Sequence, residues 1–189
     1  CAEENLRVTV PTTSAQYFHL LRNQAKREKE KPLVILTPKS LLRADVAKSR
    51  QDEILKGAFQ VLLPDTEPPK DVKRIIFCTG KIFHELFEIR KKKKISDTMI
   101  IRLEQLYPFP FDQVSEIFTQ YKDVQDIRWV QEEPRNMGAW NFALERFQKI
   151  LPKTKQIHFV GRLPSASPAA GSYQMHLAEH ELMLRQAFE

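Results

Sequence analysis

Two adjacent carboxylates are among the few residues of this 189-residue sequence whose types and spacing could do chemistry. Glu132 and Glu133 are neighbours, and such a pair can perform acid–base work when its surroundings separate the two pKa values. No histidine or nucleophilic side chain lies near them in the sequence, so we expect no catalytic role. Ion pairing with Arg102, Arg135 or Arg162 is the more economical interpretation.

Two histidines form the other arrangement with chemical potential. His176 and His180 fit the pattern H-x-x-E-H, which places two imidazoles on one face of a helix, as in some zinc hydrolases. A catalytic zinc needs a third protein ligand, and the sequence after His180 offers no separate element that returns to the site. We therefore expect no metal site and predict a terminal amphipathic helix with Leu177, Leu182 and Leu184 on its buried side. A zinc hydrolase remains an alternative hypothesis.

Glycine is scarce, which limits how the chain can bind phosphate. There are 5 glycines, and no two of them form a G-x-G pair. Dinucleotide-binding, Walker A and kinase loops need clustered glycines so that backbone N–H groups can approach phosphate. These classes are excluded, and any anionic ligand must be held in another way.

The composition indicates a globular chain with a moderate basic charge. Hydrophobic residues make up 42%, and 30 Lys and Arg against 24 Asp and Glu give a net charge of +6. No apolar run approaches the roughly 18 residues of a membrane span, and no signal peptide is recognisable. Of the two cysteines, Cys78 lies in an apolar run and is predicted to be a buried thiol, so no disulfide with Cys1 is expected. We interpret the basic run at residues 90–94 as a solvated helix end, and expect neither nucleic acid nor membrane as a partner.

Short apolar runs alternate with helical periodicities along most of the chain, which predicts parallel strands joined by right-handed helical crossovers. Strands are expected at residues 6–10, 33–36, 74–78, 98–103, 127–130 and 157–160. Helices are expected at residues 13–25, opened by a capping box, and at 81–90, 111–121, 138–150 and 174–188. Between residues 44 and 70 the pattern loosens, and residues 65–69 form a connector. The predicted fold is an α/β three-layer sandwich with a mostly parallel sheet.

Polar side chains follow four of these strands at their carboxyl ends, the edge where open parallel sheets bind ligands. The structural or interface rim comprises Arg102, Glu104, Glu132, Glu133 and Arg162, with Thr79, Lys81 and Gln131 beside it. Two interpretations stay open: helix caps, including Thr79 and Asn136, with interlocking Arg–Glu pairs, or a binding or interface rim. The segment at residues 161–172, rich in small residues and proline, cannot be a helix and is either a surface loop or an interface.

Four blocks of sequence carry a resemblance to one family. They are TPKSLLR at residues 37–43, RLEQLYP at 102–108, QEEP and NMGAW within 131–140, and GR and PSASPA within 161–169. In this order they resemble the C-terminal region of the 2-oxoglutarate dehydrogenases, the thiamine-dependent first components of their complex. The resemblance covers nearly the whole chain. It implies that residues 1–44 end a pyrimidine-binding domain and that residues 45–189 form a transketolase C-terminal-like domain.

The resemblance implies a parent enzyme larger than this chain. Enzymes of this family bind thiamine diphosphate and Mg²⁺, decarboxylate 2-oxoglutarate and pass succinyl to lipoamide on the dihydrolipoyl succinyltransferase component. They are homodimers of the bacterial cytoplasm or the mitochondrial matrix. The family's G-D-G motif ending in Asn-Asn and its active-site histidines have no match here. We therefore expect this chain alone to bind no cofactor and to be inactive, with a dimerisation or scaffold role.

The resemblance further implies an allosteric acyl-CoA site, which some members of the family have. The corresponding positions here are Arg43, Thr79, Lys81 and Gln131, and the two cations among them could meet phosphates through charge-assisted hydrogen bonds. The alternative to membership of this family is an independent basic module that binds nucleic acid or acyl-CoA.

Overall fold

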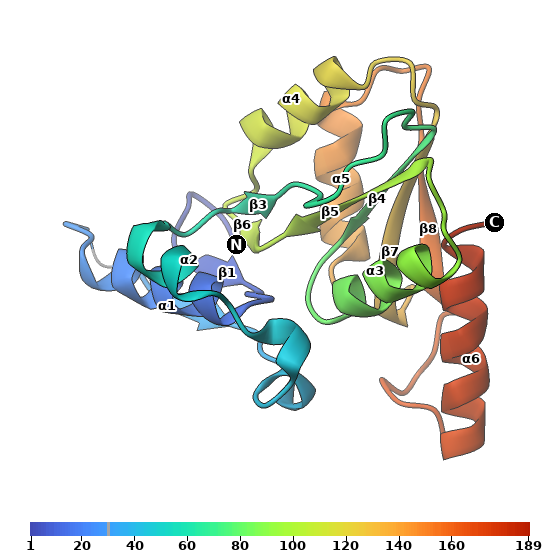
Figure 1. Ribbon diagram of the computed structural model, residues 1–189, viewed down its shortest axis with the longest axis horizontal. Coiled ribbons are helices and arrows are strands. Elements are labelled where there is room, and N and C mark those ends of the chain that lie inside the picture. Colours follow the sequence, from blue (N-terminus) through green and yellow to red (C-terminus); the bar gives the residue numbers. More distant parts are fainter. Residues whose placement is uncertain (30) are drawn as a thin grey trace.

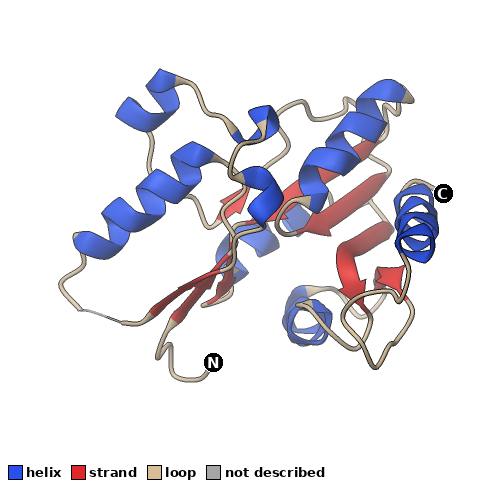
Figure 2. Cartoon of the chain, turned by 90° about the horizontal axis from the view of Figure 1, so that it is seen from below, coloured by secondary structure: helices blue, strands red, loops and turns tan. Residues whose placement is uncertain are grey.

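The strands of the chain form two separate sheets (Figure 1, Figure 2). The computed structural model describes residues 1–29 and 31–189. The larger sheet has the order β3-β5-β4-β7-β8 and the smaller one the order β2-β1-β6. The larger sheet consists of β3 (Leu62–Leu63), β4 (Arg74–Cys78), β5 (Thr98–Leu103), β7 (Asp126–Pro134) and β8 (Ile157–Arg162). The smaller sheet consists of β1 (Arg7–Thr9), β2 (Leu33–Ile35) and β6 (Gln105–Tyr107).

Helices cover both faces of the larger sheet, which confirms the predicted three-layer sandwich (Figure 1). One face packs against α3 (Ile82–Lys92) and α6 (Tyr173–Gln186), and the other against α4 (Phe111–Gln120) and α5 (Trp140–Ile150). The strands β5, β4, β7 and β8 run parallel, as expected for strands linked by single helices, and only β3 is antiparallel. No helix in the described part of the chain combines the length and hydrophobicity needed to cross a bilayer.

Strand β4 lies at the centre of the sheet and is buried on both faces. Ile75 and Phe77 point into the core under α4 and α5, whereas Ile76 and Cys78 point toward α3 and α6. This is why its sequence is continuously apolar instead of alternating. Cys78 is a buried thiol, as predicted, and burial raises its pKa to about 12, so it is inert as a nucleophile at neutral pH.

Phe147 of α5 is the centre of the core on the α4 and α5 side. Its ring lies 4.9 Å from that of Phe77, 5.6 Å from that of Phe109 and 6.1 Å from those of Phe118 and Trp129, measured between centroids. Most of these pairs are edge-to-face, an arrangement that aromatic rings prefer. The aromatic residues of two helices and two strands are thereby joined around one side chain.

The smaller sheet carries α1 (Ser14–Ala25) and takes its third strand from the middle of the chain. Strand β1 pairs in parallel with β2 and antiparallel with β6. The sequence prediction did not include β6. A long-range pairing with residues 7–9 is invisible to local periodicity, and β6 follows β5 after a single residue. Only half of the predicted capping box is present: the Thr13 hydroxyl accepts from the Gln16 N–H at 3.2 Å, while the Gln16 side chain donates to Gln60 O instead.

Other predicted elements differ in extent. Residues 44–70 are more regular than expected, because they hold a short helix, α2 (Gln51–Lys56), and the edge strand β3. Strand β7 is longer than predicted, since a register shift after Val130 lets Pro134 still pair with Arg162. The assignment of the α6 faces was partly wrong. Met183 and Ala187 are buried there, whereas Leu177 and Leu182 are exposed. A domain boundary between residues 44 and 45 stays a prediction.

Truncation of Phe147 should be severely destabilising, because its ring contacts four others and the cavity cannot collapse. We expect Phe147→Ala to lower the free energy of unfolding by about 3–5 kcal/mol. Leu163→Ala is the matched control, since Leu163 is 85% exposed, and should change it by less than about 0.5 kcal/mol. Chemical denaturation followed by circular dichroism measures both. Equal losses in the two variants would contradict the assigned core.

Candidate functional site

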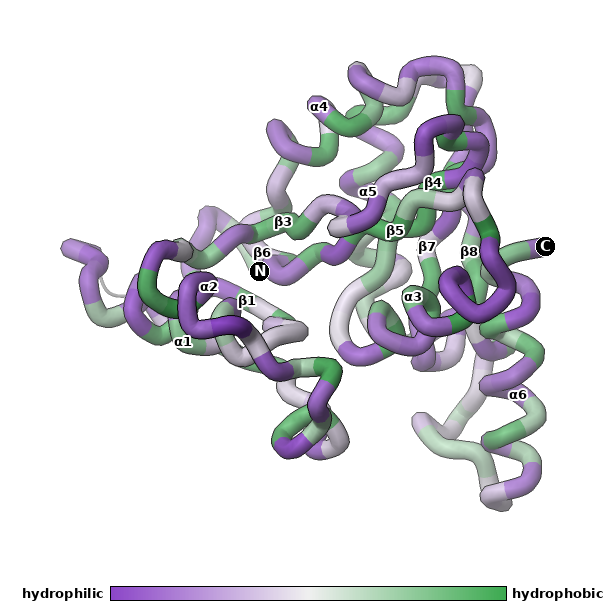
Figure 3. The backbone as a smooth tube through the Cα atoms, in the orientation of Figure 1, coloured by the Kyte–Doolittle hydropathy of each residue, from purple (hydrophilic) through white to green (hydrophobic). Residues whose placement is uncertain are grey.

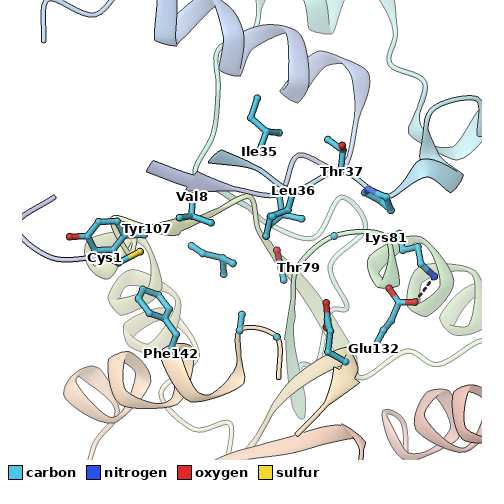
Figure 4. Close-up of a pocket in the computed structure, with 17 residues that line it drawn as sticks. Cys1, Val8, Ile35, Leu36, Thr37, Thr79, Lys81, Tyr107, Glu132 and Phe142 are labelled. Atoms are coloured by element: carbon cyan, nitrogen blue, oxygen red, sulfur yellow. Dashed lines mark ion pairs between the residues drawn. The ribbon is translucent and has the colours of Figure 1, made fainter. Parts of the chain in front are cut away.

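A cleft of about 720 Å³ lies between the smaller sheet and the carboxyl edge of the larger one. Figure 4 shows Val8, Ile35 and Leu36 approaching from the smaller sheet, and Thr79 and Glu132 lying opposite. The cleft is apolar on the side of the smaller sheet and charged at the end near α3. It is therefore formed where the strand-edge rule places ligands, but only because a second sheet covers the edge.

Lys81 and Glu132 form the charged end of the cleft, and Glu85 and His180 extend this polar chain away from it. Lys81 forms ion pairs with Glu132 of β7 and, at 3.3 Å, with Glu85 of α3, and Glu85 also hydrogen-bonds His180 of α6. Burial lowers the pKa of Lys81, but the hydrogen bonds and charges of its two carboxylates outweigh this and raise it. Burial raises the pKa of Glu132, although Lys81 opposes the shift. The cation of the cleft is thus already compensated by two carboxylates.

Thr79 and Gly80 shape the turn between β4 and α3. The Thr79 hydroxyl donates to Leu103 O at 2.8 Å, so it ties β4 to β5 and does not cap α3. Gly80 has φ +74, and a Cβ there would lie 3.3 Å from Val10 Cγ1 of the smaller-sheet segment. Glycine is needed because the backbone is left-handed and the two sheets approach closely at this point.

Gln131 is buried and fully occupied with structural hydrogen bonds. Its side-chain oxygen Oε1 accepts from Trp129 Nε1 at 2.9 Å, and its side-chain nitrogen Nε2 donates to Met137 O at 2.8 Å. Gly138 has φ +65, and a Cβ there would lie 2.8 Å from the Gln131 amide nitrogen. Gln131 therefore holds the turn between β7 and α5 and presents no free group to the cleft.

The four residues implied for an acyl-CoA site are consequently not all brought together. Thr79 and Lys81 line the cleft. Gln131 is buried behind it, and Arg43 lines a neighbouring apolar groove of about 480 Å³ beside α1, which meets the cleft at Thr37 and Pro38. An effector role for this set stays a prediction, and within the described residues the cleft offers it only the first two.

The rim residues Arg102 and Glu104 lie in a buried cluster between the two sheets. Glu104 accepts hydrogen bonds from the Thr12 N–H at 2.9 Å, from the Thr12 hydroxyl at 2.5 Å and from Gln16 Nε2 at 3.3 Å. Arg102 donates to the same Thr12 hydroxyl at 2.9 Å and lies over the Phe83 ring, 3.8 Å from its centroid. Burial raises the pKa of Glu104, and the hydrogen bonds from Thr12 and the charge of Arg102 oppose that shift.

The interlocking Arg–Glu pairs predicted for the rim have other partners. Glu132 pairs with Lys81, and Arg162 pairs with Glu179 of α6 at 2.6 Å. Arg135 instead lies over the Phe159 ring, 5.4 Å from its centroid. Local sequence could not predict these partners, because each comes from an element that lies far away in the chain or on a neighbouring strand.

Asn136 and Arg162 hold the loop that follows β8. Asn136 does not cap α5. Its side chain exchanges hydrogen bonds of 2.9 and 3.0 Å with the backbone of Ser165. Arg162 donates to Pro168 O at 2.9 Å, so residues 163–172 are fastened at both of these points. Glu133 is exposed at the mouth of the cleft.

The histidine pair does not converge with a third ligand. The rings of His176 and His180 stack with centroids 5.9 Å apart, and His180 hydrogen-bonds Glu85. Glu179, the acid of the H-x-x-E-H pattern, pairs with Arg162. Among the residues that the structure describes, no three His, Cys, Asp or Glu side chains are placed to hold a metal ion.

The fold defines the class of protein. A solved structure, described as "Split gene transketolase, inactive beta4 tetramer", matches with a TM-score of 0.67 over 97% of this chain and 56% of that chain, at 18% identity. At this identity the likeness establishes the fold alone. The chain therefore has the transketolase-like α/β architecture that the sequence predicts.

Sequence comparison identifies the family within that class. Residues 48–188 match the family described as 2-oxoglutarate dehydrogenase C-terminal, and residues 2–45 match the transketolase pyrimidine-binding domain. This chain belongs to the 2-oxoglutarate dehydrogenase C-terminal family.

Relatives in bacteria and mammals are similar over the whole chain. Identity is 41% over 189 residues to the 2-oxoglutarate dehydrogenase E1 component of Haemophilus influenzae and 44% over 190 residues to that of Cupriavidus necator. It is 46% over 188 residues to the 2-oxoadipate dehydrogenase complex component E1 of Rattus norvegicus. These alignments cover 99%, 100% and 97% of this chain but 20% of each relative. The chain thus spans a fifth of the length of these curated relatives.

The ion pair between Lys81 and Glu132 should be detectable as an energetic coupling. In a double-mutant cycle of Lys81→Met and Glu132→Gln, we expect a coupling of about 0.5–1 kcal/mol, because the pair is half-buried. The matched cycle of Arg102→Met and Glu132→Gln should be additive within about 0.5 kcal/mol, since these residues have separate partners. Denaturation midpoints of the variants measure both cycles. A larger coupling energy in the Arg102 cycle than in the Lys81 cycle would contradict the pairing of Glu132 with Lys81.

The buried carboxyl of Glu104 should make stability depend on pH. Its pKa is raised in the folded state, so folding favours the protonated form. This contribution is complete below the unfolded-state pKa, near 4.5, and is lost as pH rises through the raised folded-state pKa. We expect the stability of the wild type relative to Glu104→Gln to fall as pH rises through that window. Unfolding measured on both proteins across a pH series tests this, and a difference that grows with pH would refute it.

Proposed function

We propose that this chain is the C-terminal part of the E1 component of a 2-oxo-acid dehydrogenase complex. The observation that carries the proposal is the pair of adjacent family matches, a pyrimidine-binding segment followed directly by the 2-oxoglutarate dehydrogenase C-terminal domain. The 41–46% identity of relatives with that name over nearly all of this chain supports it. The parent enzyme would decarboxylate 2-oxoglutarate with thiamine diphosphate and Mg²⁺ and transfer succinyl to lipoamide.

The described residues do not fit the diphosphate and metal of that cofactor. No three candidate metal ligands converge among them, and Lys81, the cation that lines the cleft, is paired with Glu85 and Glu132. A diphosphate would have to displace two carboxylates that already hold the lysine, which costs both ion pairs. We therefore assign no contact with the diphosphate or the metal, and no catalytic step, to this chain.

The contribution of the chain is proposed to be structural. Strand β6 completes the smaller sheet, and the cluster of Thr12, Arg102 and Glu104 fastens that sheet to the three-layer domain. In the parent enzyme this arrangement would hold the pyrimidine-binding domain in a fixed orientation. The proposal includes a homodimeric parent, the dihydrolipoyl succinyltransferase component as its partner, and a location in the bacterial cytoplasm or the mitochondrial matrix.

The proposal predicts that activity requires sequence beyond this chain. Residues 1–189 alone should release no CO₂ from 2-oxoglutarate with thiamine diphosphate and Mg²⁺, whereas the complete product of the reading frame should. Electron transfer to ferricyanide measures turnover, and 2-oxoadipate is assayed in parallel because relatives of both names match this chain. Turnover by the isolated chain would overturn the structural role. A reading frame product inactive on both acids would overturn the assignment to this enzyme.

A further inference from the structure

The amino ends of the parallel strands gather an unusual number of lysines. Four connecting segments reach this edge of the larger sheet, at residues 67–74, 90–97, 121–128 and 149–156. Backbone and side-chain contacts join neighbouring segments: Lys73 N donates to Asp97 O at 2.8 Å, and Lys155 Nζ donates to Lys122 O. These loops lie together at the upper right of Figure 1 and are strongly hydrophilic in Figure 3. This edge is opposite to the one that forms the cleft.

The basic excess of the whole chain lies at this edge. The four segments hold 13 Lys and Arg against 5 Asp and Glu, whereas the rest of the chain holds 17 against 19. The net charge of +6 is therefore unevenly distributed: the four segments are strongly basic, and the rest of the chain is slightly acidic. Such a concentrated field attracts an oppositely charged partner and accelerates its encounter.

Most lysines of this edge are available to a partner. The arginines are engaged: Arg90 pairs with the buried Asp65, and Arg74 and Arg128 both pair with Asp126. Eight lysines form no ion pair with any described residue, and we call them the lysine edge. They are Lys70, Lys92, Lys93, Lys94, Lys122, Lys149, Lys153 and Lys155.

A groove gives part of this edge a shape that a side chain can enter. It has a volume of about 510 Å³ and lies between the segments before β4 and β5. Lys70, Lys91 and Lys94 line it together with Pro69 and Ile95. Glu67 and Asp71 also line it, but Glu67 is paired with Lys91 and Asp71 with Lys73. A glutamate side chain fits such a groove, because its carboxylate can meet the lysines and its methylene groups can contact Pro69 and Ile95.

The surroundings of the lysines favour a protein over a nucleic acid. Binding of single-stranded nucleic acid uses aromatic faces on which bases stack, and the only aromatic ring in the four described segments is that of Tyr121, which packs against the core. The exposed Glu67, Asp71 and Asp123 stand among the lysines and would repel a continuous phosphate backbone. Discrete carboxylates on a folded or helical partner can avoid those positions.

We infer that the lysine edge is a docking surface for an acidic protein segment. The groove between Pro69 and Ile95 takes one carboxylate side chain of the partner, and the lysines before β7 and β8 meet further carboxylates along the edge. Because this surface lies across the sheet from the cleft, docking leaves the cleft open. The inference does not depend on the reaction proposed for the parent enzyme.

The test measures binding of a fluorescent ten-residue polyglutamate peptide to the complete protein that carries this chain. We expect Lys70→Gln, Lys92→Gln and Lys94→Gln together to weaken binding about tenfold, because each removes one contact at the docking face. The matched control is Lys26→Gln, Lys29→Gln and Lys56→Gln, which removes the same charge from exposed positions after α1 and at the end of α2. Control binding should stay within about twofold of the wild type.

Three outcomes would overturn the inference. They are equal weakening in the two triple variants, no binding of polyglutamate at low salt, and tighter binding of a ten-residue oligothymidylate or of phosphatidylserine vesicles than of polyglutamate. Circular dichroism and thermal unfolding of both variants confirm that a loss of binding is not a loss of fold.

Discussion

Glu104 is a fully buried carboxylate at the single residue that separates β5 from β6. The chain leaves the larger sheet on one side of it and enters the smaller sheet on the other. A buried carboxylate is costly unless donors surround it, and here Thr12, before α1, and Gln16, in the first turn of α1, supply them. Satisfying one charge therefore fixes the orientation of the smaller sheet. Arg102 reaches the same Thr12 hydroxyl and supplies the opposite charge.

The cleft follows from that constraint. The smaller sheet covers the carboxyl edge of the larger one because Glu104 and β6 hold it there, and Gly80 permits the approach of Val10. The polar groups that the strand ends deliver are then mostly paired among themselves. Lys81 forms ion pairs with two carboxylates, and Gln131 hydrogen-bonds the β7–α5 turn. These contacts stabilise the structure of the edge. A cation in this state serves packing and orientation more readily than it serves phosphate binding.

The two edges of the sheet thus have opposite characters. At the carboxyl edge, charges of both signs come from different elements and neutralise each other over short distances. At the amino edge, the arginines form ion pairs with buried or half-buried aspartates, and the lysines remain in solvent. The run at residues 90–94 shows both behaviours: Arg90 turns inward to Asp65, and the lysines after it extend outward. The interpretation of that run as a solvated helix end was right for its lysines and wrong for Arg90, which is buried. It also missed the other lysines that the topology places beside the run.

The sequence by itself determined the layered α/β fold, the central strands and the family. Local periodicity predicts apolar strands such as β4 and amphipathic helices such as α5, and contiguous motifs carry the resemblance to the family. Tertiary structure alone decided β6, the partners of Glu132 and Arg162, and the burial of Gln131. Each of these depends on contacts between residues far apart in the chain, and a polar side chain has no local signal for which of several partners it will meet. For the same reason only the folded chain shows that lysines from four separate loops form one face.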